Sequence, residues 1–137
     1  CHSLIHNSGR LRRGFTDTFP MHVSRYTENR RADLERVGIE VLAESAECGL
    51  GMARHPHSGD LFVLNHLEYD ADTLASEYRR DQKEGLPTAL PQDYFPGDDP
   101  SATPVNFWRP YAFLLLSNWI NDLYQATPFD LTSLGDN

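Results

Sequence analysis

Cysteine is scarce in this 137-residue chain, and lysine occurs once, at Lys83. The two cysteines, Cys1 and Cys48, form no CxxC pair and show no zinc-finger spacing, which argues against a structural zinc site, and no metal site is predicted. Two cysteines do not make a disulfide scaffold, which favours a reduced, cytoplasmic setting. His55 and His57 lie in a short polar segment that is more typical of an exposed turn than of a metal site.

Long apolar runs are also missing. The longest, residues 111–116, is far below the roughly 18 residues that span a bilayer, and it lies too far from the N-terminus for a signal peptide. No membrane span is therefore predicted. Hydrophobic residues nevertheless make up 39% of the chain, enough to form a core and to exclude a wholly disordered polypeptide. The length suits one domain over residues 1–137.

Positive charge is in deficit overall, and it is unevenly distributed. The net charge of −8 argues against nucleic acid as a partner, because phosphate binding needs a positive face. Residues 1–36, however, hold seven arginines against four acidic residues. Arginine binds carboxylate and phosphate in a planar fork, so an anionic ligand near this segment is one interpretation. A solvated basic edge is the favoured one.

An initiating methionine is absent as well. The chain begins at Cys1 and its first methionine is Met21. This pattern predicts a processed product, a truncated form or the back part of a longer protein.

Apolar patterning and turn residues predict alternating strands and helices. Thr27 and Asp70 are expected as helix N-caps, and Gly38 and Gly85 as helix ends. The continuous apolar run at 61–64 predicts a strand buried on both faces, at the centre of the sheet. Strands are predicted over 3–5, 11–15, 39–43, 49–54 and 61–64, and helices over 28–37, 70–84 and from 108–110 to 124. Strands with covering helices indicate an α/β domain.

Two further segments stand out. Residues 86–104 contain five prolines and little periodicity, which predicts a long loop of the kind that is usually functional or disordered. In the last helix, apolar residues recur at spacings of three and four and predict a single apolar stripe. The stripe consists of Phe113, Leu116, Ile120 and Leu123.

Candidate chemistry begins where the 61–64 strand ends. His66 and Glu68 follow that strand almost at once, and ligands of open α/β sheets bind at the carboxyl ends of strands. A histidine there can accept and return a proton near neutral pH, with Glu68 fixing its tautomer or facing the substrate. A histidine that only caps a loop by hydrogen bonds is an equally valid interpretation.

A charged pair follows on the next predicted helix. Glu77 and Arg80 are three residues apart, so both side chains lie on one side of the helix. Opposite charges together suit a free amino acid, with Arg80 on its carboxylate and Glu77 on its ammonium group. Taken alone, the pair is more typical of an ordinary surface ion pair. No activated thiol and no glycine-rich phosphate loop accompany these residues.

Seven segments in order resemble one enzyme family over almost the whole chain, although each alone is short. The chain resembles the homoserine O-acyltransferases of the homoserine O-succinyltransferase family. The matching segments are Arg13-Gly14-Phe15, Ser24-Arg25-Tyr26-Thr27-Glu28, Asn65-His66-Leu67-Glu68-Tyr69-Asp70, Thr73-Leu74 with Glu77-Tyr78 and Arg80-Asp81, Tyr94-Phe95-Pro96 with Asp99-Pro100, Trp108-Arg109, and Asn118-Trp119-Ile120-Asn121 with Tyr124-Gln125 and Thr127-Pro128.

The resemblance implies a function in methionine biosynthesis: acyl transfer from acetyl-CoA or succinyl-CoA to the hydroxyl of L-homoserine, through a cysteine thioester. Acyl-CoA is then a co-substrate and no cofactor is needed. The implied fold is the flavodoxin-like sandwich of the class I glutamine amidotransferases. His66 becomes the general base and acid, Glu68 completes its triad, and Ser24, Glu77 and Arg80 bind homoserine. A homodimer is a possible assembly.

Some family features are missing here. The family's nucleophilic cysteine lies upstream of every segment present, and Cys1 does not match it. The chain therefore resembles the C-terminal half and is expected to be inactive alone. Leu67 and Asn65 stand where many members have proline and glycine, a variant within the family that leans towards acetyl transfer. Met21-His22-Val23 replaces a common Pro-His, which leaves the role of His22 open. Another amidotransferase-like hydrolase and a non-catalytic fragment are the alternatives.

Overall fold

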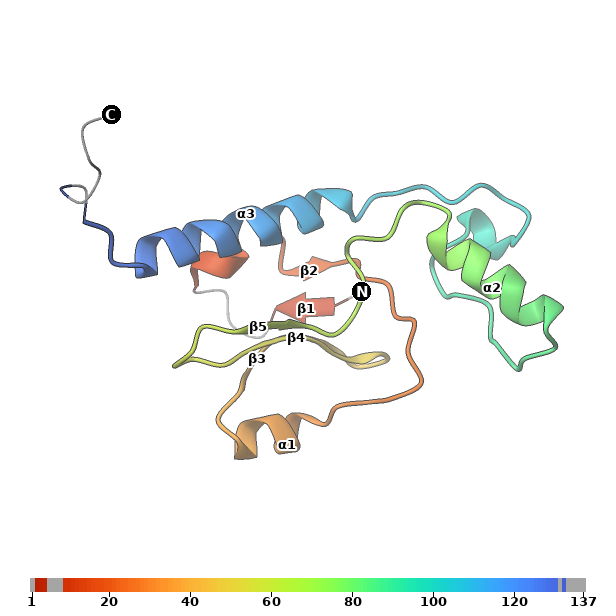
Figure 1. Ribbon diagram of the computed structural model, residues 1–137. Helices are drawn as coiled ribbons and strands as arrows, with labels where there is room; N and C mark the ends of the chain where they lie inside the picture. Colours follow the sequence, from red (N-terminus) through yellow and green to blue (C-terminus); the bar gives the residue numbers. More distant parts are fainter. Residues whose placement is uncertain (1, 5–8, 131, 133–137) are drawn as a thin grey trace.

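The computed structural model describes residues 2–4, 9–130 and 132. In this part of the chain an antiparallel sheet has the strand order β2-β1-β3-β4-β5. The strands are β1 (His2–Leu4), β2 (Thr18–Phe19), β3 (Glu40–Ser45), β4 (Gly49–Arg54) and β5 (Leu61–Val63). The long helix α3 (Arg109–Ala126) and the short helix α1 (Arg31–Arg36) lie on opposite sides of the sheet, and α2 (Thr73–Lys83) lies beyond its end (Figure 1). The predicted α/β class is confirmed.

The β3–β4 hairpin is the centre of the sheet and lies where the sequence predicts it. Its register pairs Glu40 with Arg54 and Ser45 with Gly49, with an irregularity near Ala43. Gly49 has a φ of +70°, a conformation that favours glycine and lets the chain turn back after Ser45. The middle of the hairpin is buried.

The β5 prediction is wrong in its burial and its position. The strand forms, but at the sheet edge, and the Phe62 and Val63 side chains are 38% and 42% exposed. Among the described residues no strand pairs with its outer edge. A short apolar run predicts that a strand forms, but it does not predict whether one or two strands pair with it.

The N-terminal strand prediction is also partly wrong. Residues 11–15 contain no strand: the short 3-10 helix η1 (Arg10–Arg12) is followed by a turn, and β2 comes later. Leu11, Phe15 and Phe19 are all buried in one cluster, and the neighbours Leu11 and Arg12 are both buried, which is not the alternation of a strand. β1 overlaps the strand predicted at 3–5, of which residue 5 lies outside the described residues.

Both short helices begin later than predicted. Arg30 and Asp72 stand at the N-cap positions of α1 and α2 in place of Thr27 and Asp70, and neither helix has a side-chain cap. The predicted ends are close: Gly38 and Gly85 follow the helices with φ of +78° and +71°. Residues 86–104 form the predicted long loop, interrupted by one 3-10 turn, η2 (Pro96–Asp98).

The α3 helix packs on the sheet with the face opposite to its apolar stripe. Leu115 is buried, and Tyr111 and Trp119 pack against the same cluster of buried residues as Met52 of β4. The Asn118 amide donates hydrogen bonds to two backbone carbonyls of the η1 region, at 3.0 and 2.8 Å. These two hydrogen bonds hold the Asn118 side of α3 against the η1 region. The stripe of Phe113, Leu116, Ile120 and Leu123 is exposed on the outer face.

Buried side chains form two clusters. One lies between the sheet and α3. The other joins α2 to the 86–108 segment through Leu74, Tyr94, Phe95 and Trp108. The segment from β5 to α2 connects the sheet to the α2 region (Figure 1), and it carries His66 and Glu68. The predicted catalytic residues therefore lie where the sheet meets the α2 region.

Candidate active site

His66 and Glu68 form a direct hydrogen bond. The distance between His66 Nδ1 and Glu68 Oε1 is 2.7 Å. Because an ionised carboxylate only accepts hydrogen bonds, Nδ1 is the donor in this pair, and the neutral tautomer that makes this bond has its lone pair on Nε2. An imidazole in this state is ready to take a proton at Nε2, the arrangement of a histidine general base.

The Glu68 carboxylate stays ionised in this pair. Partial burial favours its neutral form, but the hydrogen bond from His66 and those from backbone amides outweigh it and lower the pKa of Glu68 below its ordinary value. The side chain of Glu68 is exposed, so this carboxylate does not by itself fix the plane of the imidazole.

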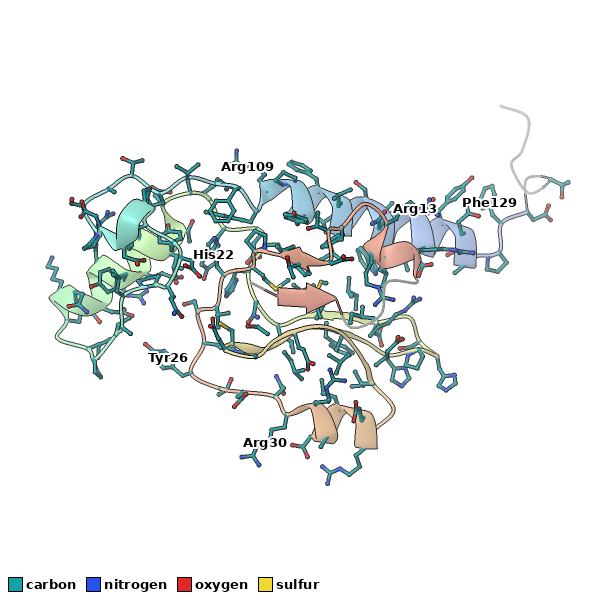
Figure 2. The ribbon with its side chains drawn as sticks, turned by 180° about the vertical axis from the view of Figure 1, so that it is seen from behind. Arg13, His22, Tyr26, Arg30, Arg109 and Phe129 are labelled. Carbon is teal, nitrogen blue, oxygen red and sulfur yellow. The ribbon has the colours of Figure 1, made fainter. Side chains whose placement is uncertain are left out.

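The backbone of His66 is held by a second histidine. His22 and His66 exchange two backbone hydrogen bonds, at 3.0 and 2.8 Å. This isolated bridge ties the loop after β5 to the segment after β2. Figure 2 shows His22 at the junction between the sheet and the α2 region. His22 thus positions the main chain of the candidate base.

The His22 ring is packed among aromatic side chains and stays neutral. Its ring meets Trp108 edge to face at 3.9 Å and Tyr94 at 5.2 Å between centroids. Burial, helped by the charge of His66, lowers the pKa of His22 to about 4. Its Nε2 is buried without a hydrogen-bond partner. His22 therefore adds no positive charge to the site at neutral pH.

Ser24 and Glu77 meet through a hydrogen bond, although they are 53 residues apart. Ser24 Oγ donates to one carboxylate oxygen of Glu77 at 2.8 Å, and the Tyr69 hydroxyl donates to the other at 2.8 Å. Burial, together with the neighbouring Glu77, raises the pKa of Tyr69 to about 12, so the phenol remains a donor. Its ring stacks on His66 with centroids 4.1 Å apart. Four predicted site residues are thus connected.

Arg80 is placed differently. Its guanidinium pairs with the neighbouring Asp81, whose side chain is almost fully buried, at 2.8 Å from Nε and 2.7 Å from Nη2. Arg80 itself is 59% exposed and lies one helical turn beyond Glu77. A cleft beside Ser24, Glu77 and Asp81 is also lined by the loop residues Pro87, Thr88, Ala89 and Pro91. The structure thus gives no direct contact between Arg80 and the Ser24–Glu77 pair.

Comparison with known proteins identifies the family. The sequence model for homoserine O-succinyltransferase matches residues 1–129. The chain belongs to this family. It is 48% identical over 124 residues to a homoserine O-acetyltransferase from Rhizobium rhizogenes, and 52% identical over 124 residues to one from Novosphingobium aromaticivorans. Each match covers 90% of this chain and 40% of the relative. The chain therefore spans about two fifths of the length of these curated relatives.

Tyr69 and Trp108 belong to the candidate site, although the sequence patterns did not predict either residue as a site residue. Trp108 is fully buried, and its indole N–H donates to the Tyr69 carbonyl at 2.8 Å. In the sequence, Tyr69 stands out only as an aromatic residue three positions after the candidate base, and Trp108 only as a tryptophan next to a proline-rich loop. Neither pattern predicts such a contact, because the two residues are 39 positions apart.

Among residues 2–4, 9–130 and 132, no three metal-binding side chains are close enough to hold an ion. Cys48 lies at the turn between β3 and β4 as a free thiol. In the same part of the chain, no helix combines the length and the hydrophobicity that a membrane crossing needs.

Proposed function

We propose that this chain supplies the acceptor side of a homoserine O-acyltransferase. His66 Nε2 takes the proton of the L-homoserine hydroxyl as its oxygen attacks the carbonyl carbon of an acyl-cysteine thioester. The C–O bond forms, the C–S bond breaks, and His66 returns the proton to the departing sulfur. The observation that carries this proposal is the 2.7 Å hydrogen bond between His66 Nδ1 and Glu68. The cysteine comes from outside this chain.

The amino-acid end of homoserine is recognised by Glu77, Ser24 and Arg80. Both carboxylate oxygens of Glu77 accept hydrogen bonds from hydroxyl groups, and this carboxylate attracts the substrate ammonium group. Arg80 binds the substrate carboxylate. The buried Asp81 holds Nε and Nη2 of Arg80, which orients the guanidinium and leaves Nη1 for a ligand.

The remaining features of the proposal follow the family. The acyl group comes from acetyl-CoA or succinyl-CoA, the pathway is methionine biosynthesis, and the setting is the cytoplasm. The flavodoxin-like sandwich forms when the sheet described above joins the remainder of the enzyme, and a homodimer is its assembly. The relatives named above are acetyltransferases, whereas the family model is named for succinyl transfer. Acetyl-CoA is the first donor to test.

A chimera provides the test. This chain replaces the matching segment of the Rhizobium rhizogenes relative, and the product is analysed with acetyl-CoA and L-homoserine. We expect O-acetylhomoserine. A folded chimera that forms none, or that instead hydrolyses glutamine as another amidotransferase-like enzyme would, contradicts the proposal. A second chimera with the Novosphingobium aromaticivorans relative replaces the first if that does not fold.

Replacement of Arg80 by alanine tests the recognition of the substrate carboxylate. In the chimera, Arg80→Ala is expected to raise the KM for L-homoserine roughly 10- to 100-fold, the effect of losing a charge-assisted hydrogen bond, and to leave the KM for acetyl-CoA nearly unchanged. Steady-state kinetics with each substrate varied measures both constants. Arg79→Ala is the matched control, because Arg79 instead contacts the Pro100 carbonyl. Equal changes in both KM values contradict the assignment.

A further inference from the structure

We propose that Tyr69 is a positioning residue that orients the His66 imidazole and links it to the amino-acid subsite. This proposal rests on the proposed function and concerns how the base is held in that reaction. The phenol ring lies face to face with the imidazole, with 4.1 Å between centroids and 22° between planes. Tyr69 is thus the aromatic side chain that stacks on His66.

Tyr69 is held by contacts that do not involve His66. Its backbone carbonyl accepts hydrogen bonds from the Trp108 indole at 2.8 Å and the Asn106 amide at 3.4 Å. Its hydroxyl donates to Glu77 at 2.8 Å. Both ends of Tyr69 are therefore fixed, one to the second cluster of buried residues and one to helix α2. His66 packs against a surface that cannot easily rotate.

His66 needs such a surface, because its other contacts do not fix the plane of its ring. The backbone bridge with His22 fixes its main chain, and Glu68 fixes the direction of Nδ1. The Glu68 side chain is 67% exposed, so the imidazole can swing with it. Stacking on Tyr69 restricts the plane of the ring, and this restriction sets the direction of the Nε2 lone pair.

The hydroxyl group of Tyr69 has a role separate from that of its ring. It donates to the carboxylate that also accepts from Ser24, so it fixes the rotamer of Glu77 in the proposed ammonium site. One side chain therefore serves two steps: its ring acts on proton transfer and its hydroxyl acts on substrate binding. Substitutions that remove the hydroxyl or the whole ring separate these two contributions.

Two variants of the chimera test this division. Tyr69→Phe keeps the stacked ring, and we expect kcat within about twofold of wild type and a KM for L-homoserine about 2- to 10-fold higher. Tyr69→Leu removes the ring, and we expect kcat to fall roughly 10- to 100-fold through misorientation of the base. A loss of kcat in Tyr69→Leu that Tyr69→Phe restores is the signature of positioning.

The control is Tyr111→Leu, which removes a tyrosine packed on Phe15 and Phe19 in the other cluster. It is expected to lower the melting temperature and to leave kcat and KM within about twofold. If Tyr69→Leu keeps full kcat in an active chimera, the positioning role is wrong while the proposed function stands. If Tyr69→Phe loses as much kcat as Tyr69→Leu, the ring is not what orients the base. An inactive wild-type chimera overturns the proposed function and this inference together.

Discussion

Replacement of His66 by glutamine is expected to lower kcat for acyl transfer to L-homoserine by about 100- to 10,000-fold in the chimera, the usual contribution of a general base. Glutamine retains a hydrogen-bonding side chain of similar length but cannot take up the hydroxyl proton at neutral pH. The KM for homoserine is expected to change little, because Ser24, Glu77 and Arg80 bind the substrate in the proposal. Steady-state kinetics over a range of homoserine concentrations measures both constants.

His57→Gln is the matched control for this substitution. His57 lies on the exposed turn between β4 and β5, so the same chemical change there is expected to leave the rate intact. A His66→Gln chimera that folds like wild type and retains more than about a tenth of the wild-type kcat contradicts the base assignment. In that case the 2.7 Å bond between His66 and Glu68 has only a structural purpose, as a cap of the loop after β5.

Replacement of Trp108 by alanine is expected to cost about 3–5 kcal/mol of unfolding free energy, the range for a large buried aromatic side chain. Trp108 is fully buried between α2 and the proline-rich loop, so its removal leaves a cavity. It also removes the indole donor to the Tyr69 carbonyl. Urea denaturation of the chimera, monitored by circular dichroism, measures the loss of unfolding free energy.

Trp119→Ala gives the comparison for Trp108. Trp119 is the second tryptophan of the chain, and it is only partly buried where α3 packs on the sheet. Its loss is expected to cost roughly 1–2 kcal/mol, because a smaller apolar area returns to water. Equal costs for the two variants contradict the view that Trp108 anchors the α2 region.

Local sequence signals predicted the elements that depend on neighbouring residues. The β3–β4 hairpin, the glycine ends of α1 and α2 and the long helix α3 all follow from turn residues and periodicity within a few positions. The same holds for His66 and Glu68, since residues two apart in a short loop reach each other without help from the rest of the fold. The two side chains are 2.7 Å apart, and their catalytic roles stay a prediction.

Predictions that depend on distant partners were less successful. The burial of β5 depends on which strands flank it, and a four-residue apolar run does not contain that information. The apolar stripe of α3 is present but exposed, because Asn118, Leu115 and Tyr111 direct the opposite face to the sheet. Tyr69 joins the site through Trp108 and Glu77, and only the fold brings these residues together.

The most direct test of the account is a single-turnover transfer. The chimera is first acylated with acetyl-CoA, excess donor is removed, and L-homoserine is added while mass spectrometry follows the acyl group on the protein. We expect the acyl group to leave wild-type chimera as O-acetylhomoserine and to remain on the His66→Gln variant at least about 100-fold longer. Equal transfer rates from the two proteins, or an acyl group that homoserine does not remove from folded wild-type chimera, would contradict the central claim.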